Sequence, residues 1–333
     1  MDEPILKIHW ERYTAHIDLD QATASTLLYP YTKEPIKQLS LLSEGCANTN
    51  YKVTFKNNTL PVVIRIYVRE KSALNREIGI HKLVKDKIPV LQHLYTDDSC
   101  TAYPYPYSVL EWVDGRLMRD VILQEKEISE CALDAGRYLS ELRDIRFSQG
   151  GFFQENLLIR PFNPEEEYFP YVLMLLQDEI VKTSLGSDLL NEVINLVKAN
   201  HHLLPEEKDA SLTHADYDPA NMLVKQEQGV WKISAILDWE FCFAGTYLLD
   251  IGMMLRYSHK LPPCFEKNFI LGIEKFSEPL PLNWKKQAKL MDLLCLLQLA
   301  HYNPPSERPK MNSDVVSLIA STVTQWGSFK NDK

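Results

Sequence analysis

The sequence predicts an α+β protein with a strand-rich first third and a mainly helical remainder. Short segments rich in Val, Ile, Leu, Tyr and Phe, separated by turn-forming residues, fill the region 36–113. Longer segments with apolar residues at helical spacing follow Gly115. Within that helical part, residues 211–239 have the pattern of a turn-rich loop followed by a β-hairpin.

The individual elements follow from periodicity and from turn-forming residues. Strands are expected at 36–43, 51–56, 61–68, 91–96 and 103–113. Helices are expected at 20–29, 71–85, 117–124, 127–145, 165–184, 186–202, 247–259, 264–276, 283–302 and 312–326. A single crossing near 110–115 divides the chain into a small N-lobe (1–110), a hinge (111–115) and a larger C-lobe (116–333). Ligand sites favour such junctions.

Composition narrows the class of protein. Hydrophobic residues make up 45% of the 333 residues, which is enough for a substantial core, and the six cysteines are too scattered for structural zinc. The net charge of −9 argues against nucleic acid and anionic lipid as partners. This acidity would suit a cationic substrate, but it is also an ordinary way to stay soluble. Without a signal peptide or a membrane-length apolar run, a soluble cytoplasmic protein is expected, as a monomer or a homodimer.

The segment His214 to Asn221 carries the chemistry, with the pattern HxDxxxxN. Phosphoryl transfer from a nucleotide needs a carboxylate that deprotonates the attacking hydroxyl and hard oxygen ligands for Mg²⁺. Asp216 can serve as the base and Asn221 can offer a side-chain oxygen to the metal. The alternative is that these residues only cap a loop, as Asp and Asn often do. His214 is expected to brace the loop through hydrogen bonds.

The following hairpin explains how a second metal ligand arrives. Its turn lies near 226–229, so the returning strand brings Asp238 back to the end of the hairpin where Asn221 stands. A carboxylate at the end of a buried apolar strand is costly unless its charge is paired, and Mg²⁺ is a suitable partner.

At this point the sequence resembles a known family. THADYDPANMLV and ILDWEFCFAGTYLLDIGMMLRY are similar to the catalytic and metal-binding segments of the aminoglycoside phosphotransferase/choline kinase-like superfamily, over roughly residues 36–302. The resemblance implies the two-lobed fold of the protein kinases, with ATP and Mg²⁺ as cofactors. It also implies that Asp216 is the catalytic base, that Asn221 and Asp238 are the Mg²⁺ ligands, and that Asp250 supports the catalytic loop.

The N-lobe adds to the resemblance. Its nucleotide loop, of the form Gly-x-x-Asn-x-x-Tyr-x-Val, implies contacts from Ser43, Gly45, Asn48, Thr49 and Asn50, although a plain hairpin turn has the same pattern. Arg65 stands where protein kinases keep a lysine, and its fork can still bind phosphate oxygens. Glu77 is its matching partner, unless both are solvated surface residues. The hinge backbone around Glu111, Trp112 and Val113 would bond the adenine edge.

Two departures from the family pattern concern the C-lobe. Leu142 and Arg143 stand where the family often has a histidine, which weakens any inference about the substrate. Ala215 and Ala220 occupy positions where glycine is frequent. Alanine fits there unless the backbone has a positive φ.

The phosphate acceptor is the least defined part. The resemblance implies a hydroxyl-bearing small molecule of aminoglycoside, amino-alcohol or sugar type. The candidate contacts in the helical half are Glu240, Tyr247, Trp284 and Asp292. Asp292 equally fits a solvated stripe with Lys285 and Lys289, and Trp284 equally fits a helix-start anchor.

Two other functions remain as alternatives to a small-molecule kinase. The first is a nucleotide-binding scaffold or regulatory pseudoenzyme, although such a protein has no need of Asp216, Asn221 and Asp238 together. The second is a protein kinase, which the absence of an Asp-Phe-Gly triplet and of an Ala-Pro-Glu segment disfavours.

Overall fold

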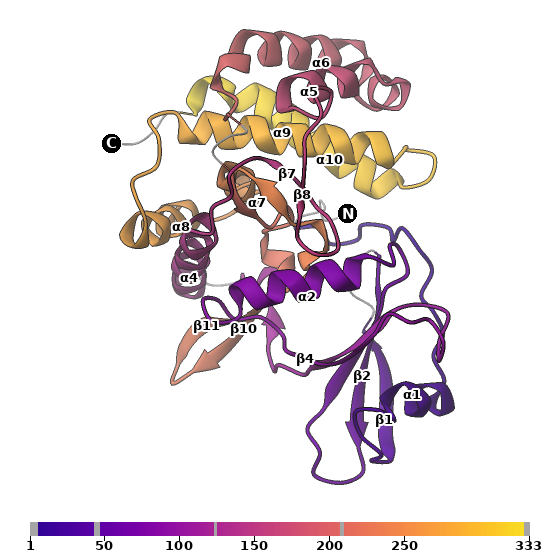
Figure 1. Cartoon of the computed structure of the whole chain (residues 1–333). Helices are drawn as coiled ribbons and strands as arrows, with labels where there is room; N and C mark the ends of the chain where they lie inside the picture. Colours follow the sequence, from indigo (N-terminus) through magenta and orange to yellow (C-terminus); the bar gives the residue numbers. More distant parts are fainter. Residues whose placement is uncertain (1–5, 43–46, 123–124, 207–209, 330–333) are drawn as a thin grey trace.

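A computed structural model describes residues 6–42, 47–122, 125–206 and 210–329, which form two lobes (Figure 1). The N-lobe is an antiparallel five-stranded sheet with the strand order β1-β2-β3-β5-β4. Its elements are α1 (Gln21–Leu28), β1 (Ile36–Leu42), β2 (Thr49–Phe55), β3 (Val62–Ile66), α2 (Ala73–Val84), β4 (His93–Asp97) and β5 (Tyr107–Glu111).

The two N-lobe helices have different roles. α1 packs on the sheet, where its Leu27 and Leu28 join Val53 and Ile64 in one apolar cluster. The side chain of Asp20 caps this helix by accepting a hydrogen bond of 2.7 Å from the backbone N–H of Thr23. α2 instead connects the lobes, because its later residues belong to the core of the C-lobe. The α+β fold expected from the sequence is confirmed.

The C-lobe combines helices with two small sheets, ordered β11-β10-β6 and β8-β7-β12-β9. Its strands are β6 (Arg116–Leu117), β7 (Gly151–Phe153), β8 (Ile159–Pro161), β9 (Ser211–Thr213), β10 (Met222–Glu227), β11 (Val230–Ile236) and β12 (Phe243–Gly245). Its α-helices are α3 (Met118–Val121), α4 (Glu125–Arg143), α5 (Tyr168–Gln177), α6 (Glu179–Asn200), α7 (Tyr247–Met254), α8 (Pro263–Phe276), α9 (Trp284–Tyr302) and α10 (Pro309–Gln325).

Glycine allows α4 and α8 to cross closely in the C-lobe core. A Cβ on Gly136 would lie 2.0 Å from the carbonyl oxygen of Phe269, and one on Gly272 would lie 2.2 Å from that of Leu133. No side chain fits in that space, so the two backbones touch. This contact fixes α4, and α4 in turn supports the catalytic segment, because Tyr217 donates a hydrogen bond of 2.8 Å to the carbonyl of Ala135.

The predicted hairpin is confirmed. β10 and β11 pair from Glu227–Val230 at the turn to Met222–Ile236 at the open end, with one irregularity between Leu223 and Val224. Beyond the last pair, the N–H of Leu237 donates to the carbonyl of Asn221 at 2.9 Å. Asn221 and Asp238 therefore emerge side by side at the open end.

Some element boundaries differ from expectation. The strand expected from residue 103 begins only at Tyr107, because prolines at 104 and 106 cannot donate to a ladder. The helix expected over 165–184 is interrupted at Asp178, whose side chain caps a new helix by accepting from the N–H groups of Ile180 and Val181. α6 then continues through a kink at Gly186, where φ is 68°. The short strands β7, β8, β9 and β12 lacked any clear alternation and were not predicted.

The segment 6–17 lies between the two lobes (Figure 1). Leu6 belongs to the C-lobe core, whereas the N–H of Ile17 donates to Thr49 of β2 in the N-lobe. In the described part of the chain, no helix has the length and apolar character needed to cross a membrane.

Candidate active site

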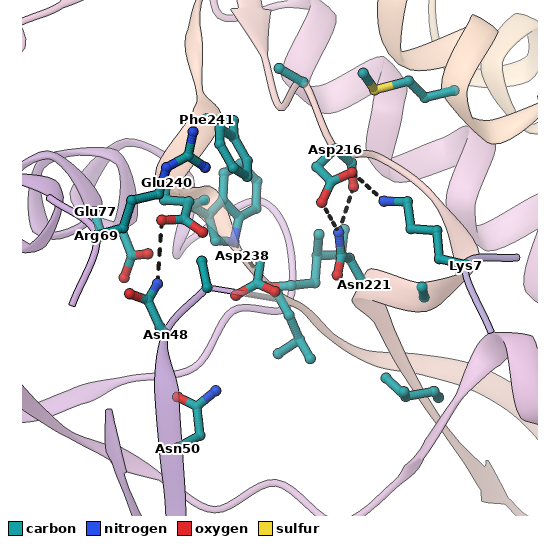
Figure 2. Close-up of a pocket in the computed structure, with 18 of the residues that line it drawn as sticks. Lys7, Asn48, Asn50, Arg69, Glu77, Asp216, Asn221, Asp238, Glu240 and Phe241 are labelled. Carbon is teal, nitrogen blue, oxygen red and sulfur yellow. Dashed lines mark hydrogen bonds and ion pairs between the residues drawn. The ribbon is translucent and has the colours of Figure 1, made fainter. Parts of the chain in front are cut away.

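A cavity of about 1470 Å³ is lined by residues of both lobes. Its C-lobe lining includes Asp216, Asn221 and Asp238, and its N-lobe lining includes Arg65 and Glu77. The side chains of Asp216 and Asp238 are 23% and 30% exposed, so both carboxylates are accessible from the cavity. Figure 2 shows these groups around a common space.

A buried carboxylate holds the start of the catalytic segment. Asp250, near the start of α7, accepts a hydrogen bond of 2.8 Å from the N–H of His214 and another of 2.8 Å from the N–H of Ala215. Burial raises the pKa of Asp250 to about 7, against the opposing effect of these two hydrogen bonds. Ala215 has a φ of 62°, in the left-handed region that favours glycine. The hydrogen bonds that Asp250 accepts thus keep Ala215 in this strained backbone conformation.

His214 braces the same loop from inside. Its Nε2 lies 2.9 Å from the carbonyl oxygen of Leu237, and its Nδ1 accepts from the N–H of Asp216 at 3.2 Å. Burial lowers the pKa of His214 to about 4, so the ring is neutral and carries its proton on Nε2. The ring also packs 4.5 Å from that of Trp239. These contacts tie the loop that carries Asp216 to the strand end that carries Asp238.

Both carboxylate oxygens of Asp216 have partners. Asn221 donates its amide N–H to Oδ2 at 2.7 Å and to the Asp216 carbonyl at 2.9 Å, which leaves the amide oxygen of Asn221 free of this interaction. The ammonium of Lys7 pairs with Oδ1 and also with Asp218. Burial would raise the pKa of Asp216, but the charge of Lys7 outweighs it and holds that pKa below its ordinary value. Asp216 is therefore ionised at neutral pH.

Arg65 joins the N-lobe to the end of the hairpin. Its guanidinium donates to Glu77 at 3.0 Å and to Asp238 at 2.7 Å. Tyr67 donates to the other oxygen of Glu77 at 2.6 Å. Burial alone would lower the pKa of Arg65, but the neighbouring carboxylates raise it well above its ordinary value, so the charge is permanent. The Arg65–Glu77 ion pair is the arrangement that protein-kinase-like enzymes require between the third strand and the following helix.

The nucleotide loop contacts the C-lobe through Asn48. Its amide donates to Glu240 at 3.3 Å, as drawn in Figure 2. Asn50 also lines the cavity, whereas Thr49 does not, because its hydroxyl lies on the other face of β2 and accepts from Ile17. The expected nucleotide contact from the Thr49 side chain is therefore wrong, since alternate strand residues point to opposite faces. The expected contacts at 43 and 45 lie outside the described residues.

The hinge residues Glu111, Trp112 and Val113 all line the cavity. The Glu111 carboxylate accepts a hydrogen bond of 2.9 Å from the N–H of Gln92, which fixes the end of β5. The ammonium of Lys52 lies 3.6 Å from the ring centroid of Trp112. The hinge residues thus border the cavity where an adenine edge is expected, although the N–H of Glu111 is already bonded to the carbonyl of Gln92 at 3.0 Å.

Three of the four expected substrate contacts are wrong. Asp292 is 1% exposed and its carboxylate pairs with Arg256, so it neither lines the cavity nor forms a solvated stripe. Trp284 and Tyr247 are buried at the starts of their helices and are absent from the described lining of the cavity. Glu240 does line the cavity, but on the side of Asn48. Burial raises the pKa of Glu240 to about 7.

Several residues of the site were not predicted from the sequence. Lys7 lies 209 positions from Asp216 and nothing local marks it. Asp218, in contrast, stands two positions after Asp216 in the recognised motif and could have been singled out. The aromatic lining contributed by Phe152, Phe162 and Tyr171 belongs to no motif that would mark these residues as part of the site.

The chemistry of the donors fits a magnesium nucleotide. The described residues contain no group of three or more His, Cys, Asp or Glu placed to hold a metal alone. A nucleotide-bound Mg²⁺ needs only one or two protein oxygens, because phosphates and water supply the rest. Asp238 and Asn221 offer a carboxylate and an amide oxygen at adjacent positions. Nε of Arg65 and Oδ1 of Asn50 are buried in the same cavity with no hydrogen-bond partner among the described residues. A bound ligand would satisfy both.

The lobes, the Arg65–Glu77 pair and the HxDxxxxN loop together define a protein-kinase-like phosphotransferase fold. A family model described as "phosphotransferase enzyme family" matches residues 38–278. The chain therefore belongs to the phosphotransferase enzyme family, and the expected relationship is confirmed. Comparison with curated proteins gives no significant match.

Solved structures match over nearly the whole chain. A mutant of aminoglycoside 2'-phosphotransferase-IIIa with GDP is 14% identical, with a TM-score of 0.69, over 93% of this chain and 99% of the other. The GDP and kanamycin complex of APH(2'')-IIIa is 14% identical, with a TM-score of 0.68, over 92% and 99%. Aminoglycoside phosphotransferase APH(4)-Ia is 16% identical, with a TM-score of 0.65, over 92% and 99%. These likenesses establish the fold.

Proposed function

We propose that the protein is an ATP-dependent small-molecule kinase that transfers the γ-phosphate to a hydroxyl group. The observation that carries this proposal is the convergence of Asp216, Asn221 and Asp238 on one cavity that Arg65 also lines. The nucleotide would lie between the N-lobe (1–110) and the C-lobe (116–333), with its base against the hinge (111–115). Complexes of matched structures with GDP, with ADP and with AMP-PNP support a nucleotide in this place.

Each side chain has a part in the proposed reaction. Asp216, held ionised, orients the acceptor hydroxyl and takes its proton as the bond to phosphorus forms. Asn221 and Asp238 would hold Mg²⁺, which when bound supplies positive charge against the nucleotide phosphates. Arg65 would donate its free Nε–H to a phosphate oxygen. His214 and Asp250 keep the loop in position and do not contact the reacting atoms.

The decisive experiment replaces the proposed base. Asp216→Asn keeps the shape of the side chain but removes its basicity, so kcat is expected to fall by roughly 10²-fold or more. Turnover would be measured by coupled ADP release over a panel of sugars, amino alcohols, kanamycin and hygromycin B. Asp188→Asn, on the exposed side of α6, is the matched control. Unchanged turnover in Asp216→Asn would remove this residue from the mechanism.

The same experiment separates a kinase from a scaffold. A scaffold would gain thermal stability from Mg²⁺ and ATP, yet release no ADP with any acceptor in the panel. A kinase releases ADP at a rate that depends on the acceptor. The convergence of Asp216, Asn221 and Asp238 on one cavity, which a scaffold does not need, favours the kinase.

A further inference from the structure

The N-terminal segment 6–17 is anchored to both lobes. Glu11 accepts hydrogen bonds of 3.0 Å from the N–H groups of Lys310 and Met311, at the start of α10 in the C-lobe. Three residues later, the Thr14 hydroxyl donates to the carbonyl of Ala47 in the nucleotide loop at 2.7 Å. Arg12 donates to the carbonyl next to that one at 3.0 Å. The segment is thus a fixed wall of the cavity.

This wall delivers one ammonium group to the acceptor side of the cavity. Lys7 extends between Asp216 and Asp218, and its side chain is only 13% exposed. Figure 2 shows Lys7 reaching Asp216 from the side opposite to Glu240 and Asn48. Leu6 and Lys7 have φ values of 53° and 63°, which are strained for residues other than glycine. Burial disfavours the charge on Lys7, but the two carboxylates outweigh it and raise its pKa above the ordinary value.

The position held by Lys7 is the one that a cationic substrate would need. An ammonium group on an acceptor would be drawn to a carboxylate near its hydroxyl, and here Asp216 lines the cavity while Asp218 is buried beside it, with Lys7 bridging the two. Both already have a cation. Arg256 also lines the cavity, but its charge is balanced by the buried carboxylate of Asp292. A second ammonium at this point would meet like charge instead of free carboxylates.

Much of the remaining lining contributed by the C-lobe is aromatic or aliphatic, with Gln298 and Cys295 as polar neighbours. Phe152, Phe162, Tyr168, Tyr171 and Tyr302 belong to it, together with Met253. The nearby carboxylate of Glu166 is committed to Arg160, with contacts of 2.8 and 2.9 Å. Such a lining offers contact area to an apolar or ring-bearing body, because ring faces and methylene groups gain from apolar contact.

We propose that Lys7 is a specificity-determining residue that fills the ammonium position beside Asp216, so that the phosphate acceptor is an uncharged hydroxyl compound with an apolar or ring-bearing body. This inference rests on the proposed function, since it concerns the acceptor of that reaction. The acceptor proposed for this chain thus differs in charge from kanamycin, a compound with several amino groups that is bound in one of the matched structures.

The test measures binding of a polyamine with and without Lys7. The full chain is saturated with Mg²⁺ and AMP-PNP and titrated with kanamycin in a calorimeter. Wild type is expected to bind kanamycin only weakly, near the limit that the titration detects. Lys7→Ala, which frees both the space and the carboxylates, is expected to bind kanamycin at least about tenfold more tightly, because a charge-assisted pair becomes available. Lys198→Ala, at an exposed position of α6, is the control and should match wild type.

A second variant protects the test from a folding defect. Lys7→Met keeps most of the packing of the side chain while removing the charge, and it should also gain kanamycin binding. AMP-PNP affinity within about threefold of wild type shows that each variant is folded. If wild type itself fails to bind AMP-PNP, the proposed function fails before the acceptor is considered.

Two results would overturn the inference about Lys7 while leaving the kinase intact. Kanamycin binding to wild type as tightly as to Lys7→Ala would show that Lys7 gives way to a cationic ligand. Failure of both Lys7 variants to gain kanamycin binding, with AMP-PNP affinity preserved, would show that Lys7 does not set the selectivity.

Discussion

The side of the cavity proposed to bind the nucleotide and the side proposed to bind the acceptor, called the nucleotide side and the acceptor side below, differ in how the sequence marks them. On the nucleotide side, Arg65 and Glu77 come from a strand and the helix that follows it, 12 residues apart in the sequence. On the other side, Lys7 meets Asp216 across 209 residues, and the aromatic residues come from the stretch 152–171 and from Tyr302. Local motifs therefore mark the residues of the first region, although Arg65 also reaches Asp238 across 173 residues, whereas no motif marks the residues of the second.

The difference has a chemical reason. Every nucleotide presents the same phosphates, so the groups that bind them recur at fixed spacings along a strand, a loop and a hairpin. An acceptor varies from one enzyme to the next, and loops and helices far apart in sequence can adapt to it. The predictions that follow test whether residues assigned to each region behave accordingly.

The largest effect, a loss of stability, is expected from replacing Asp292, which is buried in the C-lobe and does not line the cavity. Its carboxylate accepts from Nε of Arg256 at 2.8 Å, and both side chains are almost fully buried. Asp292→Asn would leave the Arg256 charge without a compensating carboxylate, so the free energy of unfolding should fall by about 3–5 kcal/mol. Urea unfolding followed by tryptophan fluorescence would measure it, with Asp188→Asn expected within about 0.5 kcal/mol of wild type.

An acceptor contact would behave in the opposite way. If Asp292 bound substrate, its replacement would preserve stability and raise the KM for the acceptor. That result would contradict the buried ion pair with Arg256 and would support Asp292 as a contact of the phosphate acceptor.

This residue illustrates what the sequence could not specify. The spacing of Asp292 with Lys285 and Lys289 predicted a solvated stripe, but α9 is packed on both sides and Lys289 is itself buried, with its ammonium on the carbonyl of Leu255. Apolar periodicity predicts one buried face of a helix. It does not reveal whether other elements also cover the opposite face. The hairpin, in contrast, was predictable to its open end, because strand pairing follows directly from the position of its turn.

The second effect concerns Arg65 on the nucleotide side. The variant Arg65→Lys keeps the positive charge but loses the planar guanidinium group. A lysine ammonium could not contact both Glu77 and Asp238 and still donate a further N–H to a phosphate. Hydrogen bonds to charged groups contribute about 1.5–3 kcal/mol, so the Kd for AMP-PNP with Mg²⁺ should rise roughly tenfold or more. Calorimetry would measure it. Arg160→Lys, which alters an exposed pair with Glu166, should leave that Kd unchanged.

A pH dependence should reveal the buried state of His214. Its pKa is about 4 in the folded chain and near 6.5 in the unfolded chain, so between these values only the unfolded chain binds the proton. Acidification through this window therefore destabilises wild type, and a variant without the imidazole is spared that loss. The stability advantage of wild type over His214→Asn should shrink by about 2 kcal/mol from pH 7 to pH 5, at about 1.4 kcal/mol per pKa unit.

Urea unfolding at the two pH values would measure this change. A constant difference between wild type and His214→Asn would mean that His214 titrates normally in the folded chain. It would then not be the neutral brace between the catalytic loop and the strand that ends at Asp238.

The smallest effect on stability is expected at Ala215, a position where glycine is frequent in the family that the sequence resembles. A φ of 62° costs a residue with a Cβ roughly 1–2 kcal/mol, whereas glycine adds about 0.5–1 kcal/mol of backbone entropy on unfolding. Ala215→Gly should therefore leave the free energy of unfolding unchanged or raise it by up to about 1.5 kcal/mol. Ala220→Gly, in the same loop but without a positive φ, should lower it by about 0.5–1 kcal/mol. Equal losses in the two variants would show that Ala215 carries no strain, and that Asp250 holds a relaxed loop.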